Sequence, residues 1–382
     1  MKQKLFKVYG FINSLKYPQE LFAVVKSMYD QELYENDKHI QMAADWLLYM
    51  QNDDGGYSRK FSFINGRDKS YIETTGYIVP TLLQLKEEKY KNSALRAGEW
   101  LLSVQNSDGS FSDIDHNQPF VFDTGQVLLG LNTLFAFTQD KRYYQALQKA
   151  ANWLCAVQEE DGSWQNFAYN NQKHTYYSRV AAALYKAGEL MRDKRIKEKA
   201  LKNIEWVISN QSENGFFAYS SFREDTPPFL HTLIYVLEGL LDIYDMTQEQ
   251  RILDAVLKNA SKFKELQVKR DLLLCSQYNE NFDCVNNEHC ITGLAQWAGV
   301  ALRIYELTQE EEFLKVASST LLYLKAKQLK SSSMRGGFSA SIPFWGRYGG
   351  FDFVNWSNKF FIDAMLLHQK IVKNDKSVES GD

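Results

Sequence analysis

The sequence has little cysteine, no excess of charge of one sign and no long apolar run, and each absence excludes a class of protein. Four cysteines in 382 residues are too few for a disulfide scaffold, so a reducing, cytoplasmic location is expected. Segment 1–28 lacks the apolar stretch and small-residue cleavage site of a signal peptide. No run of about 18 apolar residues occurs, so no integral membrane segment is expected. The net charge of −3 provides no basic field for nucleic acid.

The short motifs of several common enzyme classes are also missing. The sequence contains no glycine-rich phosphate loop, no dinucleotide-binding fingerprint and no nucleophile elbow. No cofactor is therefore expected.

A repeat of about 53 residues dominates what is present. Four tryptophans, spaced 54, 53 and 53 residues apart, are each followed five positions later by glutamine: Trp46, Trp100, Trp153 and Trp206, then Gln51, Gln105, Gln158 and Gln211. A glycine turn closes each copy. Tyr323 and Gln328 keep the same offset, whereas the segment near Phe263 and Gln267 has drifted.

Each copy predicts two helices. The first is amphipathic and ends at the glycine turn. The second is apolar nearly all round, as expected of a helix buried on both sides, over 73–85, 123–135, 176–190, 231–244, 290–307 and 355–368. Six helix pairs predict an all-α protein, an (α/α)6 toroid of about 12 helices in a double ring. Residues 1–372 are expected to form one toroid domain, followed by a polar tail over 373–382.

The tryptophan–glutamine spacing resembles the QW-type repeats of the terpene cyclase and protein prenyltransferase superfamily over roughly residues 40–370. The same toroid is the fold of sugar-active enzymes, including unsaturated glucuronyl hydrolases, uronate lyases and sugar epimerases. The segments ETTGYIVPT, DTGQVLLGL, HTYYSRVA, HTLIYVLEGLL, HCITGLAQ and NWSNKFFIDAMLL are similar to bacterial toroid proteins encoded among cell-surface polysaccharide genes. The resemblance implies a glycan or sugar-derivative substrate.

In a closed double ring all the second helices start at one rim, so polar residues at their starts are expected to meet. The candidate catalytic residues are Glu73, Asp123, His174, Tyr177 and His231. The candidate substrate-binding residues are Tyr77, Gln126, Tyr176, Arg179, Trp164, Trp345, Arg347, Trp356 and Lys359. For several of the polar residues, Asp123 included, helix capping is the alternative interpretation.

The chemistry follows from the residue types. Glu73 and Asp123 could divide the proton donation and water activation that hydrolysis of a glycoside or hydration of an unsaturated uronate requires. His174, Tyr177 and His231 could remove a proton next to a carboxyl group, as a lyase or epimerase must. Arg179 offers a forked donor set for a carboxylate, or else pairs with Glu73 or Asp123.

The leading hypothesis is therefore an enzyme acting on an acidic, uronate-containing glycan, with hydrolase, lyase and epimerase all open. An isoprenoid enzyme is the second hypothesis, and a non-catalytic glycan-binding or scaffold protein is the third. Zinc at Asp283, Cys284, His289 and Cys290 is a minor alternative, because the ligand types are right but the spacing matches neither prenyltransferases nor lanthionine cyclases. The segment Asp113-Ile-Asp115-His116 lacks the final acid of a cyclase DxDD motif and is interpreted as a solvated loop. The oligomeric state is left open.

Overall fold

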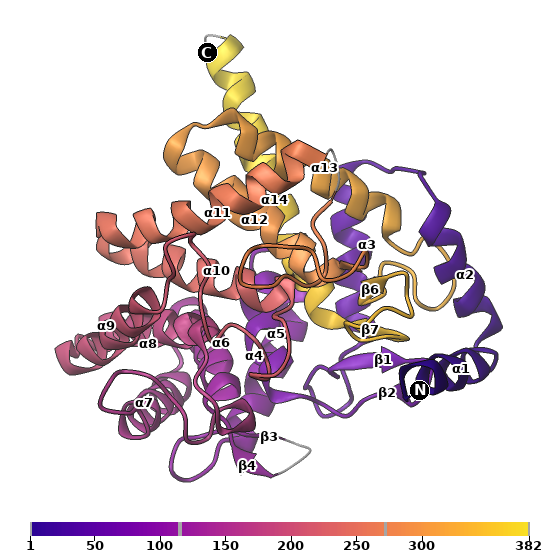
Figure 1. The fold of residues 1–382 in the computed structure, drawn as a ribbon. Helices are drawn as coiled ribbons and strands as arrows, with labels where there is room; N and C mark the ends of the chain where they lie inside the picture. The colour runs from indigo at the N-terminus through magenta and orange to yellow at the C-terminus, as the bar shows by residue number, and fades with distance from the viewer. Residues whose placement is uncertain (1, 114–116, 271–272, 381–382) are drawn as a thin grey trace.

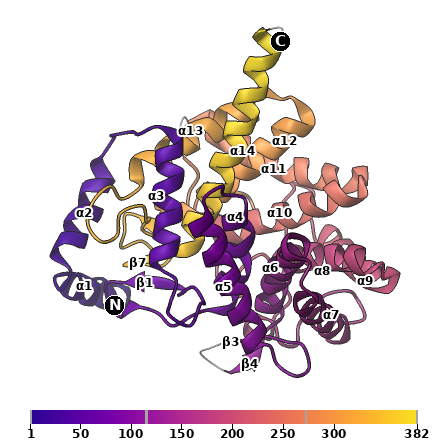
Figure 2. The same ribbon diagram turned by 180° about the vertical axis from the view of Figure 1, so that it is seen from behind.

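The computed structural model describes residues 2–113, 117–270 and 273–380. Twelve of its helices form two concentric layers around one axis, as Figures 1 and 2 show from opposite sides. The inner layer comprises α4 (Ile72–Leu83), α6 (Val121–Thr138), α8 (Ser178–Met191), α10 (Leu230–Thr247), α12 (Ile291–Thr308) and α14 (Asn355–Ser380). The outer layer comprises α3 (Asn36–Tyr49), α5 (Glu88–Val104), α7 (Lys141–Ala156), α9 (Lys194–Ser209), α11 (Gln250–Arg270) and α13 (Glu311–Lys327).

The inner helices pack against one another in chain order, and the last of them, α14, returns to contact the first, α4. Each outer helix packs on the inner helix next to it in sequence, except that α3 packs on α14. The predicted (α/α)6 toroid is therefore confirmed, and the ring is closed. The inner helices are mostly buried along their length, which is why their sequences read as apolar on all sides.

The repeated glutamine has one structural task in all the regular copies. Its side-chain amide donates to the carbonyl of the turn glycine and to a carbonyl of the next outer helix. In the first copy, Gln51 Nε2 lies 2.8 Å from both Gly55 O and Ser93 O. Gly55 adopts φ +101°, and a β-carbon there would lie 2.7 Å from Arg96 O on that next helix. The glutamine and the glycine thus clamp each turn onto its neighbour.

The same clamp closes the ring. Gln328 Nε2 donates to Gly336 O in its own turn and to His39 O in α3, both at 3.1 Å. In the drifted fifth copy, Gln267 reaches forward to Thr320 Oγ1 at 2.9 Å and accepts from Trp297 Nε1 at 2.8 Å. The sixth copy therefore keeps both hydrogen bonds of the repeat. The fifth copy keeps only the bond to the next outer helix.

Short strands lie in the loops at the rim where the inner helices begin. A three-stranded sheet, in the order β2–β1–β7, joins β1 (Lys60–Ser62), β2 (Gly66–Arg67) and β7 (Asp352–Val354). It ties the first loop to the last, and Trp46 Nε1 also donates to Asn355 Oδ1 at 3.1 Å. Two further antiparallel pairs join β3 (Ser112–Asp113) to β4 (Gln118–Pro119) and β5 (His289–Cys290) to β6 (Ser341–Ile342).

Two helices precede the ring and lie at the edge of the molecule, α1 (Lys2–Ser14) and α2 (Pro18–Tyr29) (Figures 1 and 2). At the other end of the chain, α14 runs past residue 373, where the sequence predicted a tail, and its end projects from the body. The helix α4, which contains Pro80, has 12 residues against 18 in α6. No helix of the described ranges is long and apolar enough to cross a membrane.

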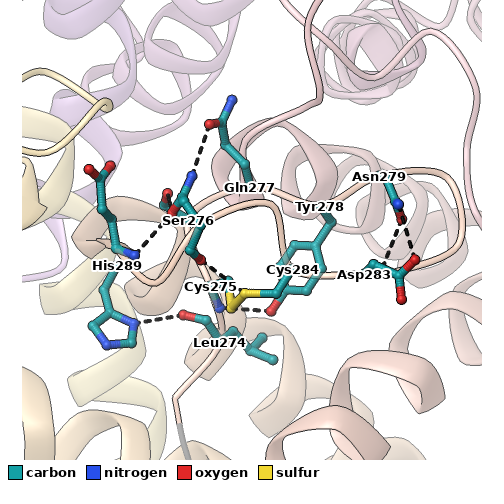
Figure 3. Close-up of a disulfide and its surroundings, with 11 residues drawn as sticks. Leu274, Cys275, Ser276, Gln277, Tyr278, Asn279, Asp283, Cys284 and His289 are labelled. Carbon is teal, nitrogen blue, oxygen red and sulfur yellow. Dashed lines mark hydrogen bonds between the residues drawn. A yellow bond between two sulfur atoms is a disulfide. The ribbon is translucent and has the colours of Figure 1, made fainter. Parts of the chain in front are cut away.

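A disulfide joins Cys275 to Cys284 in the loop between α11 and α12 (Figure 3). The loop is held by Cys275 N donating to the Tyr278 hydroxyl at 2.7 Å and by Ser276 Oγ donating to Asn286 Oδ1 at 2.8 Å. Its backbone also accepts from Leu230 N, the first residue of α10, through Ser276 O at 2.8 Å. A disulfide is unexpected in the reducing compartment that the cysteine count suggested.

Candidate active site

A cavity of about 260 Å³ lies at the rim where the inner helices start. We call it the rim cavity. Its lining combines one cation, two carboxyl groups and one histidine with a majority of aromatic side chains: Arg59, Tyr71, Glu73, Phe120, Phe122, Asp123, Tyr169, Tyr176, Phe222, His231, Tyr235, Tyr348 and Trp356. Residues at the starts of five of the six inner helices line this cavity. A closed ring was expected to bring these helix starts together.

Three polar residues reach the cavity from the first turn of a helix. Glu73 is the second residue of α4, Asp123 the third of α6 and His231 the second of α10. Aromatic residues, Tyr71 and Phe120, occupy the N-cap positions of α4 and α6. Because Phe120 is the N-cap of α6, Asp123 is not the capping residue that the alternative interpretation required.

Burial sets the protonation of the two carboxyl groups. It raises the pKa of Glu73 to about 7, while Arg179 and Arg59 act in the opposite direction and Asp113 adds to the increase. Burial raises the pKa of Asp123 well above its usual range, and the nearby carboxyl groups of Glu73 and Asp113 raise it further. Both shifts favour the protonated form of the carboxyl group, and in both burial is the largest cause.

One atom of Asp123 is left without a partner. Its side chain is 2% exposed, and Oδ2 has no hydrogen-bond partner among the residues that the structure describes. A buried polar oxygen without a partner costs free energy, on the order of 1–3 kcal/mol. Since Asp123 lines the cavity, a ligand bound there could supply the missing partner.

His231 is held in one tautomer by a chain of hydrogen bonds. Gln296 donates through Nε2 to Glu238 at 3.1 Å, so its Oε1, 2.7 Å from His231 Nδ1, must accept the proton that Nδ1 carries. The other ring nitrogen, Nε2, is therefore unprotonated. Burial lowers the pKa of His231 to about 3, with Gln296 opposing this and Arg179 adding to it, so the imidazole is neutral.

The rim cavity also contains residues that sequence reasoning missed. Arg59 follows the first glycine turn, and its Nε donates to Asp68 Oδ2 at 3.0 Å while the guanidinium lies 5.1 Å from the Tyr71 ring centroid. Tyr348 comes from the loop between β6 and β7 and accepts from Trp356 Nε1 at 2.7 Å. Both residues belong to loops, whose position relative to the helices no helical periodicity reports.

Arg179 lies elsewhere, and its predicted partners were wrong. Its Nη1 donates to Glu238 at 2.6 Å and its Nε to Gln126 Oε1 at 3.3 Å, so neither Glu73 nor Asp123 is its ion-pair partner. Together with Tyr77 and Lys359 it lines a second cavity, of about 270 Å³, further along the inner helices. We call this the distal cavity. The positions of Tyr77, Arg179, Lys359 and Gln126 do not suit contact with a ligand in the rim cavity.

His174 and Tyr177 are buried behind the rim cavity and do not line it. Tyr177 accepts from Tyr169 N at 3.0 Å, and His174 Nε2 lies 2.9 Å from Tyr169 O. Both therefore hold the segment that carries Tyr169, which itself lines the cavity. The neighbouring Tyr176 does reach the cavity, as does Trp356.

Three of the predicted substrate-binding residues, Trp164, Trp345 and Arg347, lie outside the rim cavity. Trp164 is fully buried and donates to Leu154 O at 3.0 Å. Trp345 packs against Phe11 and Phe344. Arg347 is exposed, and its backbone N–H donates to Glu288. None of these three lines the rim cavity.

The four residues of the zinc alternative do not converge. Cys284 is joined to Cys275, and His289 Nδ1 lies 2.9 Å from Leu274 O (Figure 3). The Cys290 sulfur accepts from Gly293 N at 3.4 Å, at the start of α12. No group of three or more His, Cys, Asp or Glu side chains in the described ranges is placed to hold a metal ion.

Asp113 corrects the interpretation of its segment as a solvated loop. It lies on β3, is 7% exposed, and acts electrostatically on both Glu73 and Asp123. Asp115 and His116 lie outside the described residues.

A closed double ring of helix pairs with a polar pocket at the helix starts defines an α/α toroid. The chain belongs to the prenyltransferase α/α-toroid domain family, whose model matches residues 20–218 and 126–341. Similar sequences include sporulenol synthase of Bacillus subtilis, 30% identical over 164 residues, or 34% of this chain and 24% of that protein. The squalene–hopene cyclase of Zymomonas mobilis is 26% identical over 198 residues, 46% of this chain and 29% of that enzyme. The matched segments thus cover about a quarter of these relatives' length.

Solved structures with the same fold include sugar-processing enzymes. An unsaturated glucuronyl hydrolase specific for heparin superposes with a TM-score of 0.71 at 14% identity, covering 88% of this chain and 98% of that one. The cellobiose 2-epimerase of Bacillus thermoamylovorans gives a TM-score of 0.68 at 15% identity, covering 85% and 95%. At such identities the likeness shows the fold alone.

Proposed function

We propose that the protein is a carbohydrate-active enzyme that binds an acidic, uronate-containing sugar in the rim cavity. Asp123 donates a proton to the sugar, and Glu73 accepts one from water or from a ring carbon. The observation that carries the proposal is the buried Asp123 carboxyl, which has an unpaired oxygen and a raised pKa and lines the same cavity as Glu73, whose pKa is raised to about 7. General acids and bases work best when their pKa values lie near the operating pH.

The lining of the cavity supports a sugar as the ligand. Aromatic faces such as those of Phe122 and Trp356 suit the apolar faces of a sugar ring, and the hydroxyls of Tyr176 and Tyr235 suit its oxygens. Arg59 is the guanidinium placed to meet a carboxylate. A volume of about 260 Å³ is at the small end for ligand pockets, which favours one sugar residue over a long chain segment.

Location and pathway are part of this proposal. The resemblance to proteins encoded among surface-polysaccharide genes supports a glycan intermediate of that metabolism. A cytoplasmic location remains a prediction, and the Cys275–Cys284 disulfide weighs against it because disulfides persist in oxidising compartments.

The test is incubation with saturated and unsaturated uronic-acid oligosaccharides. A hydrolase or hydratase removes the absorbance of the conjugated uronate double bond, a lyase creates it, and an epimerase incorporates solvent deuterium. We expect Asp123→Asn and Glu73→Gln to lose about 100-fold or more in kcat. Glu99→Gln, on the exposed side of α5, is the matched control and should keep full activity. No change in any uronate, or full activity of both site variants, contradicts the proposal.

A second candidate is an isoprenoid cyclisation, which the mostly aromatic lining and the raised pKa of Asp123 also suit. The sequence relative named as a squalene–hopene cyclase supports it. Against it, the cavity is small and carries Arg59, Glu73 and several tyrosines. If the protein turned over polyprenyl substrates and Asp123→Asn abolished that turnover, this candidate would be established instead. If Asp123→Asn and Glu73→Gln both complemented a deletion strain, the protein would instead be assigned a non-catalytic binding role.

A further inference from the structure

The first two helices present apolar side chains to solvent. Eleven of the twenty large hydrophobic residues that are strongly exposed in the described part of the chain lie between Leu5 and Leu33. Several are more than two-thirds exposed, including Leu15 at 70%, Phe22 at 69% and Tyr29 at 79%. A concentration of this kind marks a surface that is covered by something in the working state.

The exposed residues form stripes at helical spacing. On α1 they are Leu5, Val8 and Ile12, at i, i+3 and i+7, and Leu15 continues this stripe in the turn directly after the helix. On α2 they are Phe22, Val25 and Tyr29, also at i, i+3 and i+7. We call these two stripes the apolar stripes.

The opposite side of α1 holds the helix on the body. Gly10, Asn13 and Ser14 are buried there, and Gly10 lies so close to the Phe351 ring that a β-carbon would collide with it. Helix α1 therefore contacts the body through small and polar residues and through the rings of Phe6 and Phe11, while Leu5, Val8 and Ile12 stay exposed.

The charge of this region selects among possible occupants. Residues 1–19 contain four lysines and no acidic residue, although the whole chain carries a net charge of −3. The rest of α2 carries one charge of each sign, Glu20 and Lys26, so the positive charge belongs to α1 and the turn after it. Lys4 and Lys16 are exposed beside the stripe on α1. A second copy docked by a two-fold axis through this surface would bring two lysine-rich α1 segments into one interface, which opposes association. A surface of anionic lipid headgroups offers both the charge and the apolar boundary that α1 requires.

We propose that α1 and α2 bind the surface of an anionic lipid bilayer, with the apolar stripes inserted at the boundary between headgroups and acyl chains. The lysines then meet the lipid phosphates. This proposal does not depend on the reaction in the rim cavity.

The bound face lies next to the candidate active site. Phe11 of α1 packs against Phe344, Trp345 and Phe351, with ring centroids 5.7, 5.4 and 5.2 Å away. These three residues belong to the loop that carries Tyr348 into the rim cavity. Attachment through α1 would hold this side of the cavity close to the lipid surface.

The experiment is co-sedimentation of the full chain with two kinds of vesicle, phosphatidylcholine alone and an equimolar mixture with phosphatidylglycerol. We expect partition onto the anionic vesicles that weakens as salt rises. The variants Ile12→Gln/Leu15→Gln and Lys4→Glu/Lys7→Glu should each reduce the partition coefficient about tenfold or more. The controls are Leu322→Gln, an exposed leucine on α13, and Lys149→Glu/Lys258→Glu, the same charge change elsewhere. Both should bind like the wild type, and all variants should keep the wild-type circular dichroism and melting curve.

Absence of binding to anionic vesicles overturns the proposal, as does equal binding to neutral ones. So does unchanged binding by both test variants. A dimer in sedimentation that Ile12→Gln/Leu15→Gln converts to monomer would assign the apolar stripes to a second copy and would also overturn it.

Discussion

At the scale of single residues, hydrogen-bond donors decide whether a partly buried carboxyl group stays ionised. Burial is the largest influence on Asp161 as well as on Glu73. At Asp161, however, bonds from Lys173 and from Ser163 outweigh burial and lower its pKa to about 2. At Glu73 the positive charges of Arg179 and Arg59 do not outweigh it, and the pKa rises to about 7. The pKa values of the site carboxyl groups are thus raised because few hydrogen-bond donors reach these groups.

This difference predicts how stability depends on pH. The folded pKa of Glu73, about 7, lies above the unfolded value of 4.5, so its contribution is favourable at low pH and is lost as pH rises toward 7. Glu73→Gln removes this loss and should become more stable relative to the wild type between pH 5 and 8, by on the order of 3 kcal/mol at the upper end. Urea unfolding across that range measures it. Asp161→Asn, with the opposite shift, should be less stable than the wild type throughout the range.

Arg59 gives a second prediction at this scale. Arg59→Gln should raise KM about 10- to 100-fold for an acidic sugar and leave KM for its neutral, reduced analogue nearly unchanged, because a charge-assisted hydrogen bond is lost. Arg59 also lowers the pKa of Glu73, so the acidic limb of the pH–rate profile should move to higher pH in the variant. Equal effects on both sugars, with an unmoved profile, would assign Arg59 a structural role, to which its bond to Asp68 contributes.

At the scale of elements, the repeated glutamine explains why so much of the fold is visible in the sequence. Each copy repeats the same two hydrogen bonds, so the residues that make them recur at a fixed period. The fifth copy has lost its turn contact, and its sequence signature has faded with it. Helix pairs, ring closure and the first-turn positions of Glu73, Asp123 and His231 were predictable for this reason.

The rest of the site was not predictable because one helical turn moves a residue by about 5.4 Å along the axis. Glu73 lines the rim cavity, whereas Tyr77, four residues later, lines the distal cavity. Lys359 follows Trp356 by three residues and is likewise one turn too deep. The loop residues Arg59 and Tyr348 have no periodicity that could place them. A list of helix-start residues therefore mixes two levels of the ring.

The closing clamp at Gln328 gives a prediction for this scale. Gln328→Ala leaves His39 O without its side-chain donor and His39 Nδ1 without its acceptor, 2.6 Å away in the wild type. It also removes one of two side-chain donors to Gly336 O, which keeps Asn358 Nδ2 at 2.8 Å. All of these groups are buried, so a loss of about 2–4 kcal/mol in the free energy of unfolding is expected. Gln84→Ala is the matched control, because Gln84 is exposed and bonds only within its own helix. Comparable urea midpoints for the two variants would contradict the clamp.

At the scale of the whole molecule, a buried polar layer crosses the ring between the two cavities. Arg179 of α8 contacts Gln126 of α6 and Glu238 of α10, and Glu238 accepts from Gln296 of α12. Gln296 in turn fixes the tautomer of His231 in the rim cavity. The guanidinium also lies over the Tyr235 and Phe360 rings, 4.8 and 5.6 Å from their centroids. Four inner helices and the candidate site therefore share one charged group.

Removing that charge should therefore weaken the ring as a whole. Arg179→Met leaves Glu238 buried without its main cation, which is expected to cost about 3–5 kcal/mol. Burial already raises the pKa of Glu238 and Arg179 opposes the rise, so the pKa climbs further in the variant. Its folded value then lies further above the unfolded one, and the destabilisation should grow as pH rises.

The control is the double variant Arg179→Met/Glu238→Gln, which has neither charge of the pair. It should regain much of the lost stability, and its stability should depend less on pH than that of Arg179→Met. Thermal unfolding of the single and double variants at several pH values measures both effects. If Arg179→Met alone melts like the wild type at every pH, the polar layer does not join the helices energetically, and the ring is held by its apolar packing and its glutamine clamps.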